Sequence, residues 1–104
     1  MDRIAPVKAF NKDLILATCF DIRNLKERSL FFDRWGDQGG IYLIQYRHDP
    51  LVYYIGITNN FRSRLAAHLK LKANNKFHLF VKLVGWENFS FSIIEICREN
   101  SQVP

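Results

Sequence analysis

Two β-rich runs stand out along the chain, at residues 41–46 and 52–57, where β-branched and aromatic side chains dominate. The turn-like stretch Arg-His-Asp-Pro at 47–50 separates them, so the two runs predict a β-hairpin. A third strand is predicted over 89–96, because aromatic and aliphatic residues alternate with two serines at its start. These three strands form the predicted sheet.

Two helical patterns lie between the hairpin and the third strand. The first begins at a cap, Asn59 or Asn60, and runs to about residue 71. The second covers about 75–84, and Gly85 is placed to end it. The apolar positions of the two helices, in order, are Phe61, Leu65 and Leu69, then Phe77, Phe80, Val81 and Val84. The order strand, strand, helix, helix, strand predicts an α+β fold with a small three-stranded antiparallel sheet flanked by helices.

The N-terminal part of the chain is less regular. Residues 25–35 predict a short helix with Leu30 and Phe31 facing inward and Arg28 and Asp33 facing outward. The residues before it are mixed and give no clear element. The chain has no repeat and no linker that would mark a boundary between domains. We expect an N-terminal extension at 1–38 and a domain at 39–104.

The excess of positive charge is concentrated in the middle of the chain. At 104 residues the chain has room for one compact domain, and its formal net charge is +5. Residues 50–86 carry six basic side chains and no acidic one, which suits a polyanion such as DNA or RNA, although a basic run is also typical of a solvated face. The six are Arg62, Arg64, Lys70, Lys72, Lys76 and Lys82.

Several classes of protein are excluded or disfavoured. No run approaches the roughly 20 apolar residues that a membrane span needs, and the first dozen residues have no apolar signal core. We therefore expect an intracellular protein that is not secreted. Cys19 and Cys97 have no CxxC spacing that would start a zinc site. They predict two reduced thiols in or near the core, and hence a reducing compartment.

The hairpin strands carry two tripeptides, Gly40-Ile41-Tyr42 and Tyr54-Ile55-Gly56, with eleven residues between them. Arg64 follows Tyr54 by ten residues, and His68 follows Arg64 by four. In these tripeptides and their spacing the chain resembles the GIY-YIG nuclease superfamily, from residue 39 to about residue 96. The helix before the first tripeptide is similar to that of intron-encoded members, the homing endonucleases.

The resemblance implies roles for four residues. Tyr42 or Tyr54 would orient or deprotonate a water, Arg64 would bind the scissile phosphate, and His68 would assist by hydrogen bonding. A tyrosine is a poor base at its free pKa of about 10, but a nearby arginine favours the phenolate, so both tyrosines are expected to lie near Arg64. Taken singly, each residue has a structural alternative: a cross-strand aromatic, a solvated arginine or a packing histidine.

Further residues are expected to face the nucleic acid or to pack. Gly40 and Gly56 would keep backbone bulk away from it. The cations expected to contact phosphates are Arg62, Lys70, Lys72 and Lys76, with solvated side chains as the alternative. His78 is either a second functional histidine or a packing residue. Tyr53 points to the opposite face from Tyr54 and is expected to pack.

The metal site is the weakest part of the resemblance. The family takes a glutamate ligand from a helix after the third strand, and this chain has no clear counterpart, so the metal ligands are unknown. Glu95 and Glu99 come too early for that role and are expected to be surface carboxylates. Either the domain is C-terminally incomplete, or it has lost its metal ligand. In both cases part of one sheet face should be uncovered and available to a partner.

Two functions are therefore expected from the sequence. The first is a phosphodiester-cleaving endonuclease that uses Mg²⁺ or another divalent cation and is possibly intron-encoded. The second is an inactive nucleic-acid-binding or structural component of an organellar ribonucleoprotein such as a mitochondrial ribosome. Both place the chain in a mitochondrion or another organelle, and neither fixes DNA or RNA as the partner.

Overall fold

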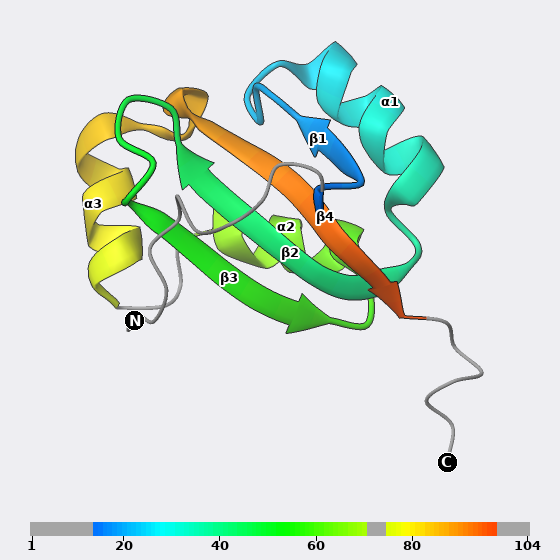
Figure 1. Cartoon of the computed structure of the whole chain (residues 1–104). Helices are drawn as coiled ribbons and strands as arrows, with labels where there is room; N and C mark the ends of the chain where they lie inside the picture. Colours follow the sequence, from blue (N-terminus) through cyan, green and yellow to red (C-terminus); the bar gives the residue numbers. More distant parts are fainter. Residues whose placement is uncertain (1–13, 71–74, 98–104) are drawn as a thin grey trace.

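A computed structural model describes residues 14–70 and 75–97. Its centre is an antiparallel sheet with strand order β1-β4-β2-β3 (Figure 1). The strands are β1 (Ala17–Cys19), β2 (Gly39–Tyr46), β3 (Tyr53–Thr58) and β4 (Phe89–Cys97). The α+β class, the hairpin and the C-terminal strand are confirmed. The predicted number of three strands is wrong, because β1 pairs with β4 and adds a fourth.

The helices begin where the sequence offers asparagine caps. They are α1 (Leu25–Trp35), α2 (Phe61–Leu69) and α3 (Lys76–Val84), and a short 3₁₀ turn, η3 (Trp86–Asn88), leads into β4. The side chains of Asn24, Asn60 and Asn75 each accept a hydrogen bond from a backbone N–H in the first turn. Of the two caps considered for α2, Asn60 is therefore the one used. Gly85 ends α3 at a φ of 89°, as expected for a terminating glycine.

All three helices cover one face of the sheet, which we call the helix face. Phe91 lies at its centre, with the ring of Tyr42 stacked on it at 5.3 Å between centroids. The side of Phe91 near α1 meets the ring of Phe32 at 5.3 Å, and α2 contributes Phe61 at 6.1 Å. Toward α3, the ring of Phe77 packs against that of Phe89 at 5.6 Å. The core is thus a continuous aromatic layer between sheet and helices.

The helix α1 has the predicted bounds, and Phe31 faces inward and Asp33 outward as predicted, but the inward position predicted for Leu30 is wrong. Phe31 and Phe32 are its buried residues, whereas Leu30 is 64% exposed. Adjacent residues differ by about 100° around a helix, so the pair at 31 and 32 centres the buried stripe away from Leu30. Through these two side chains α1 covers Phe91 on the helix face. The expectation that part of one sheet face is uncovered concerns no particular residue and stays a prediction.

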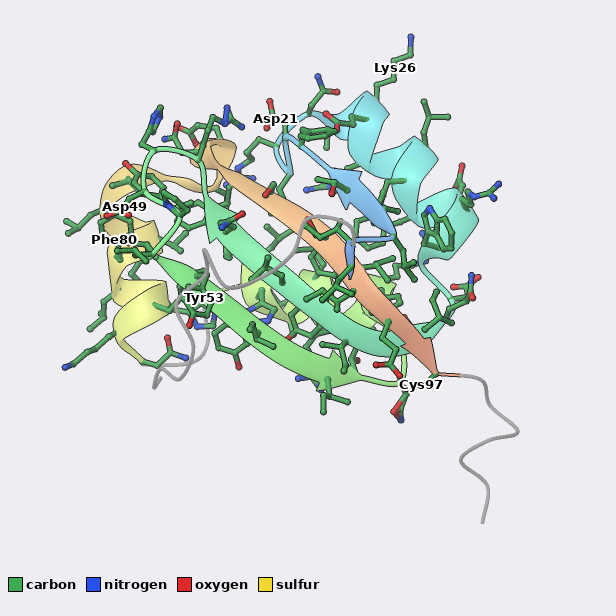
Figure 2. All side chains as sticks on the ribbon, viewed as in Figure 1. Asp21, Lys26, Asp49, Tyr53, Phe80 and Cys97 are labelled. Carbon is green, nitrogen blue, oxygen red and sulfur yellow. The ribbon has the colours of Figure 1, made fainter. Side chains whose placement is uncertain are left out.

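The two cysteines have different surroundings. Cys19 is fully buried in the core, where burial first of all, and then the charge of Glu27, raise the pKa of its thiol to about 11. Cys97 is exposed at the end of β4 (Figure 2), so the expectation of a core position holds for Cys19 alone. Within the described residues no helix is long and apolar enough to cross a membrane.

Candidate active site

The two signature tyrosines share the helix face. In the hairpin, Tyr42 pairs with Gly56 and Tyr54 pairs with Ile44, which makes the tyrosines diagonal neighbours. Their rings are stacked, with 6.3 Å between centroids and 23° between planes. Tyr42 is completely buried, whereas Tyr54 is half-buried. The predicted pairing on one face is confirmed, and Tyr54 is the tyrosine that solvent reaches.

Gly56 makes room for the ring of Tyr42. A Cβ atom at this position would overlap the hydroxyl group and the outer ring carbons of Tyr42. The phenol of the first tripeptide therefore lies across the glycine of the second. This packing of Tyr42 requires a residue without a side chain at position 56. Gly40 has a different local reason: its φ is 154°, and a Cβ would collide with the carbonyl oxygen of Glu95. The predicted contacts of both glycines with nucleic acid stay predictions.

A buried chain of hydrogen bonds begins at Tyr42. Its hydroxyl lies 2.8 Å from Nε2 of His68, and Nδ1 of His68 lies 2.8 Å from Nε2 of His78. Both histidines are 4% exposed. The helix α2 supplies His68 and α3 supplies His78, so the chain ties both helices to the sheet. The sequence left His78 between a functional and a packing role, and the structure places it directly behind His68.

The environment keeps His68 neutral. Burial, followed by the charges of His78 and Arg64, lowers its pKa from 6.5 to about 4. At pH 7 the imidazole therefore carries one N–H and one free lone pair. It can accept a hydrogen bond on one side and donate on the other, which suits the middle position of the chain.

Arg64 extends the chain to the surface. It lies on the exposed side of α2, and the charge of its guanidinium lowers the pKa of Tyr42, which places the cation near the phenol oxygen. A positive charge on that side favours a phenol proton that points to Nε2 of His68, and Nδ1–H of the neutral His68 is then the donor to Nε2 of His78. This surface cation thus favours one direction of the buried hydrogen bonds.

Burial outweighs the arginine in setting the ionisation of Tyr42. Desolvation, with a smaller contribution from Tyr54, raises the pKa of Tyr42 to about 12 despite the opposing effect of Arg64. Arg64 lies near Tyr42 and favours the phenolate, as expected, but burial outweighs it and the net shift of the pKa is upward. This residue is therefore a neutral phenol at pH 7.

Tyr54 sits at the edge of the same cluster. Its ring contacts His68 at 4.8 Å and Phe77 at 5.4 Å, and it stacks on His78 at 6.2 Å with 12° between planes. The ring is thus held on three sides, while the residue keeps part of its surface in solvent. Tyr53 pairs with Gln45 and lies on the opposite face, as predicted from strand alternation.

Among the other predicted cations, Arg62 lies away from this cluster. Arg62 turns toward α1, where it donates to the carbonyl of Phe32 at 2.7 Å and pairs with Asp37 at 3.3 Å. Lys70 follows α2 as its exposed C-cap, and Lys76 begins α3, also exposed. Lys72 lies outside the described residues.

The described residues do not fit a divalent-metal site. They contain no group of three or more His, Cys, Asp or Glu side chains that could hold a metal ion. Glu95 pairs with Ile41, so its side chain is on the face opposite Tyr42. The charges that shift the pKa values of Tyr42 and His68 belong to tyrosine, arginine and histidine and to no carboxylate of the described ranges. Glu99 lies outside them.

The fold and the cluster define a small α+β domain with a tyrosine, histidine and arginine site on one sheet face. The sequence model of the GIY-YIG catalytic domain matches residues 38–103 of this chain. The chain therefore belongs to the GIY-YIG catalytic domain family, which implies a nuclease-type function and binding of nucleic acid. No curated protein and no solved structure matches the chain. The division into 1–38 and 39–104 stays a prediction.

Proposed function

We propose that the chain is the catalytic module of a GIY-YIG endonuclease, which hydrolyses a phosphodiester bond in nucleic acid. The observation that carries the proposal is the convergence of Arg64 and His68 on the hydroxyl of Tyr42, beside the solvent-accessible Tyr54. A surface arginine that is oriented from below by a buried neutral network is a preorganised binder of a phosphate.

Each residue has one task in this proposal. The guanidinium of Arg64 binds the non-bridging oxygens of the scissile phosphate and stabilises the charge that develops on them. The hydroxyl of Tyr54 orients the attacking water, because it is the partly exposed phenol of the pair. Tyr42 and His68 are positioning residues, since both are buried and reach the substrate only through Arg64. The water oxygen bonds to phosphorus as the bond to the leaving oxygen breaks. The water gives up one proton to the solvent, and the leaving oxygen takes up one from it.

A divalent cation such as Mg²⁺ is the cofactor that we propose for the active enzyme. It would supply charge neutralisation at the phosphate. The described residues do not form its site, so none of the steps above passes through it.

We further propose that the enzyme is of the intron-encoded, homing type, acts on DNA and works in a mitochondrion or another organelle. The support for this subtype is the helix α1, which precedes the first tripeptide strand and packs on the domain. A separate DNA-binding region would then select the cleavage site.

The second candidate is a nucleic-acid-binding protein without cleavage activity, for instance a component of an organellar ribonucleoprotein. One observation favours it: within the described ranges, no carboxylate is found among the charged groups that act on Tyr42 and His68. Such a protein would retain Arg64 as a phosphate contact and would show salt-dependent binding alone.

A cleavage assay distinguishes the endonuclease from the inactive nucleic-acid-binding protein. Supercoiled plasmid and a structured RNA would be incubated with the protein in Mg²⁺ and in EDTA. We expect Mg²⁺-dependent cutting that Arg64→Ala lowers by about 100-fold, the effect of losing one preorganised donor. Lys82→Ala is the matched control, since it removes one positive charge from an exposed position on α3 and should cut normally. Binding by a folded protein that cuts neither substrate would favour the second candidate.

A further inference from the structure

A groove runs between α1 and α2, on the side of α2 that is turned away from the tyrosine cluster. Its volume is about 390 Å³. Side chains from both helices line it, among them Arg28, Ser29, Phe32, Arg62, Leu65 and Leu69. The family match begins at residue 38, so one wall of the groove, α1, comes from outside the matched region. The groove is therefore a feature of this chain that the family assignment does not explain.

We propose that this groove binds a second nucleotide of the nucleic acid strand whose scissile phosphate lies at Arg64. The proposal rests on the proposed function and adds a contact that is independent of the cleavage chemistry. It assigns the phosphate of that nucleotide to the two arginines at the rim, and its base to the apolar floor.

The rim has the charge that a phosphate requires. Arg28 comes from α1 and Arg62 from α2, and no acidic residue is among the side chains that the described ranges contribute to the lining. Within those ranges, Arg28 uses one of its five N–H donors, on the carbonyl of Ile22. Arg62 uses two, on Phe32 and Asp37. Both guanidinium groups are thus held in place with donors left for a phosphate.

The floor has the chemistry that a base requires. Phe32 and Leu65 are buried beneath the groove, and the apolar surface that a base can reach comes mainly from Leu69, which is half-buried, and from Leu25, which is 67% exposed. Apolar surface accepts a base of any sequence, because every base has an apolar face. Apolar floor and cationic rim together match a nucleotide better than they match a free anion.

The position of the groove allows one strand to reach both sites. Arg62 and Arg64 are two residues apart on α2, or about 200°, so they flank the helix on opposite sides. The exposed surface of α2 between them carries the small side chains of Ser63, Ala66 and Ala67 and no acidic residue. The helix is about 10 Å wide, a distance that a strand of a few nucleotides can cross. Because the exposed side chains between the two arginines are small, the backbone of the strand can cross the helix there.

Two adjacent residues of α1 allow a matched test. Ser29 lines the groove, whereas Leu30 is exposed on another side of the helix and is not part of the lining. Lys26 likewise points into solvent, away from the sheet (Figure 2). Ser29→Glu and Leu30→Glu each add one negative charge to nearly the same place in the molecule. They differ in whether that charge enters the groove.

Binding would be measured by fluorescence anisotropy with a labelled single-stranded DNA of about 12 nucleotides, over a series of salt concentrations. We expect Ser29→Glu to weaken binding about 10-fold and to lower the salt slope by about one, while Leu30→Glu stays within about two-fold of the original protein. Ser29→Lys should strengthen binding more than Leu30→Lys does. This opposite substitution keeps the test decisive if the glutamate variant fails to fold.

The outcomes separate this proposal from the function on which it rests. If the substitutions at positions 29 and 30 change DNA affinity equally while Arg64→Ala still weakens binding, the groove is not a nucleotide site, but the proposed function stands. Salt-independent binding, or no binding, by the original protein would overturn both. A groove that binds an apolar peptide but not the oligonucleotide would also overturn the proposal.

Discussion

Tyr42 is the most deeply buried of the residues that we assign to the site. Its hydroxyl lies between a surface arginine and a buried histidine, and its ring fills the space above Gly56. Because its pKa is raised to about 12, it carries its proton throughout the neutral range. We therefore assign the water-orienting role to Tyr54 and regard Tyr42 as the residue that holds Arg64 in position.

The fit of Tyr42 over Gly56 predicts a strong effect of a single methyl group. Gly56→Ala should lower the free energy of unfolding by about 1–3 kcal/mol, because the new Cβ overlaps the phenol. In a Tyr42→Leu background, where the hydroxyl and most of the ring are gone, the same substitution should cost well under about 1 kcal/mol. Urea unfolding of the four proteins measures this cycle. Additive effects would show that the two residues do not interact.

The lowered pKa of His68 predicts a loss of stability in acid. Its folded pKa is about 4 against 6.5 in the unfolded chain, so between these values the unfolded state binds more protons. The stabilisation is complete above pH 6.5 and is lost as the pH falls toward 4, with a full size of about 3 kcal/mol. The groups that the structure describes around the ring are Tyr42, Tyr54, Arg64, His78 and Trp86, and none of them carries a negative charge that would compensate for a charge on it.

This acid sensitivity can be isolated with His68→Gln, which keeps a polar side chain but does not titrate. Urea unfolding at several pH values between 4 and 7 should show a steep fall in stability for the original protein and a shallower one for the variant. Parallel curves for the two proteins would contradict the assignment, because other titrating groups would then account for the whole effect.

Part of the site could be predicted from single residues and part could not. The shared face of Tyr42 and Tyr54, and the opposite face for Tyr53, follow from strand alternation and hairpin pairing, which are local. The ionisation of Tyr42 depends on how deeply it is buried, because desolvation outweighs Arg64 in setting its pKa. Sequence spacing contains no information about this depth, so the net rise of the pKa could not be predicted.

Among the helices and strands, α1 shows most clearly what the sequence could and could not predict. Its bounds were predictable from its sequence, since a helix and its asparagine cap are local features. Its buried face was predictable only in part: Phe31 faces inward as predicted, but the choice between Leu30 and Phe32 depends on where Phe91 lies in the sheet. The strand β1 was missed for a similar reason: three residues carry little periodicity, and their partner in β4 is more than 70 residues away.

Because α1 covers Phe91, a substitution on its buried side should lower the free energy of unfolding far more than a substitution on its exposed side. Phe32→Ala should lower the free energy of unfolding by about 3–5 kcal/mol, since it leaves a cavity against Phe91. Leu30→Ala, at a position that is 64% exposed, should change it by less than about 1 kcal/mol. Thermal or urea unfolding measures both. Similar small losses would indicate that α1 is not a part of the folded core.

At the scale of the whole molecule, α2 lies between the surface of the tyrosine cluster and the surface of the groove. One side carries Arg64 and His68 toward the tyrosines, and the other carries Arg62 toward α1 and the groove. The charge pattern of the sequence predicted a basic middle segment, but it could not separate these two sides. Their separation follows from helix geometry once α1 is in place, and it allows cleavage and strand binding to be altered independently.

The central claim is that the helix face of the hairpin is the catalytic face. Tyr54 and Tyr53 are neighbours on β3 that point to opposite faces, so the same substitution at each provides the most direct test. Single-turnover cleavage and DNA affinity would be measured for Tyr54→Phe and Tyr53→Phe. We predict that Tyr54→Phe slows cleavage by about 100-fold with little change in affinity, and that Tyr53→Phe cleaves at nearly the original rate. Equal rates for the two variants would contradict the account.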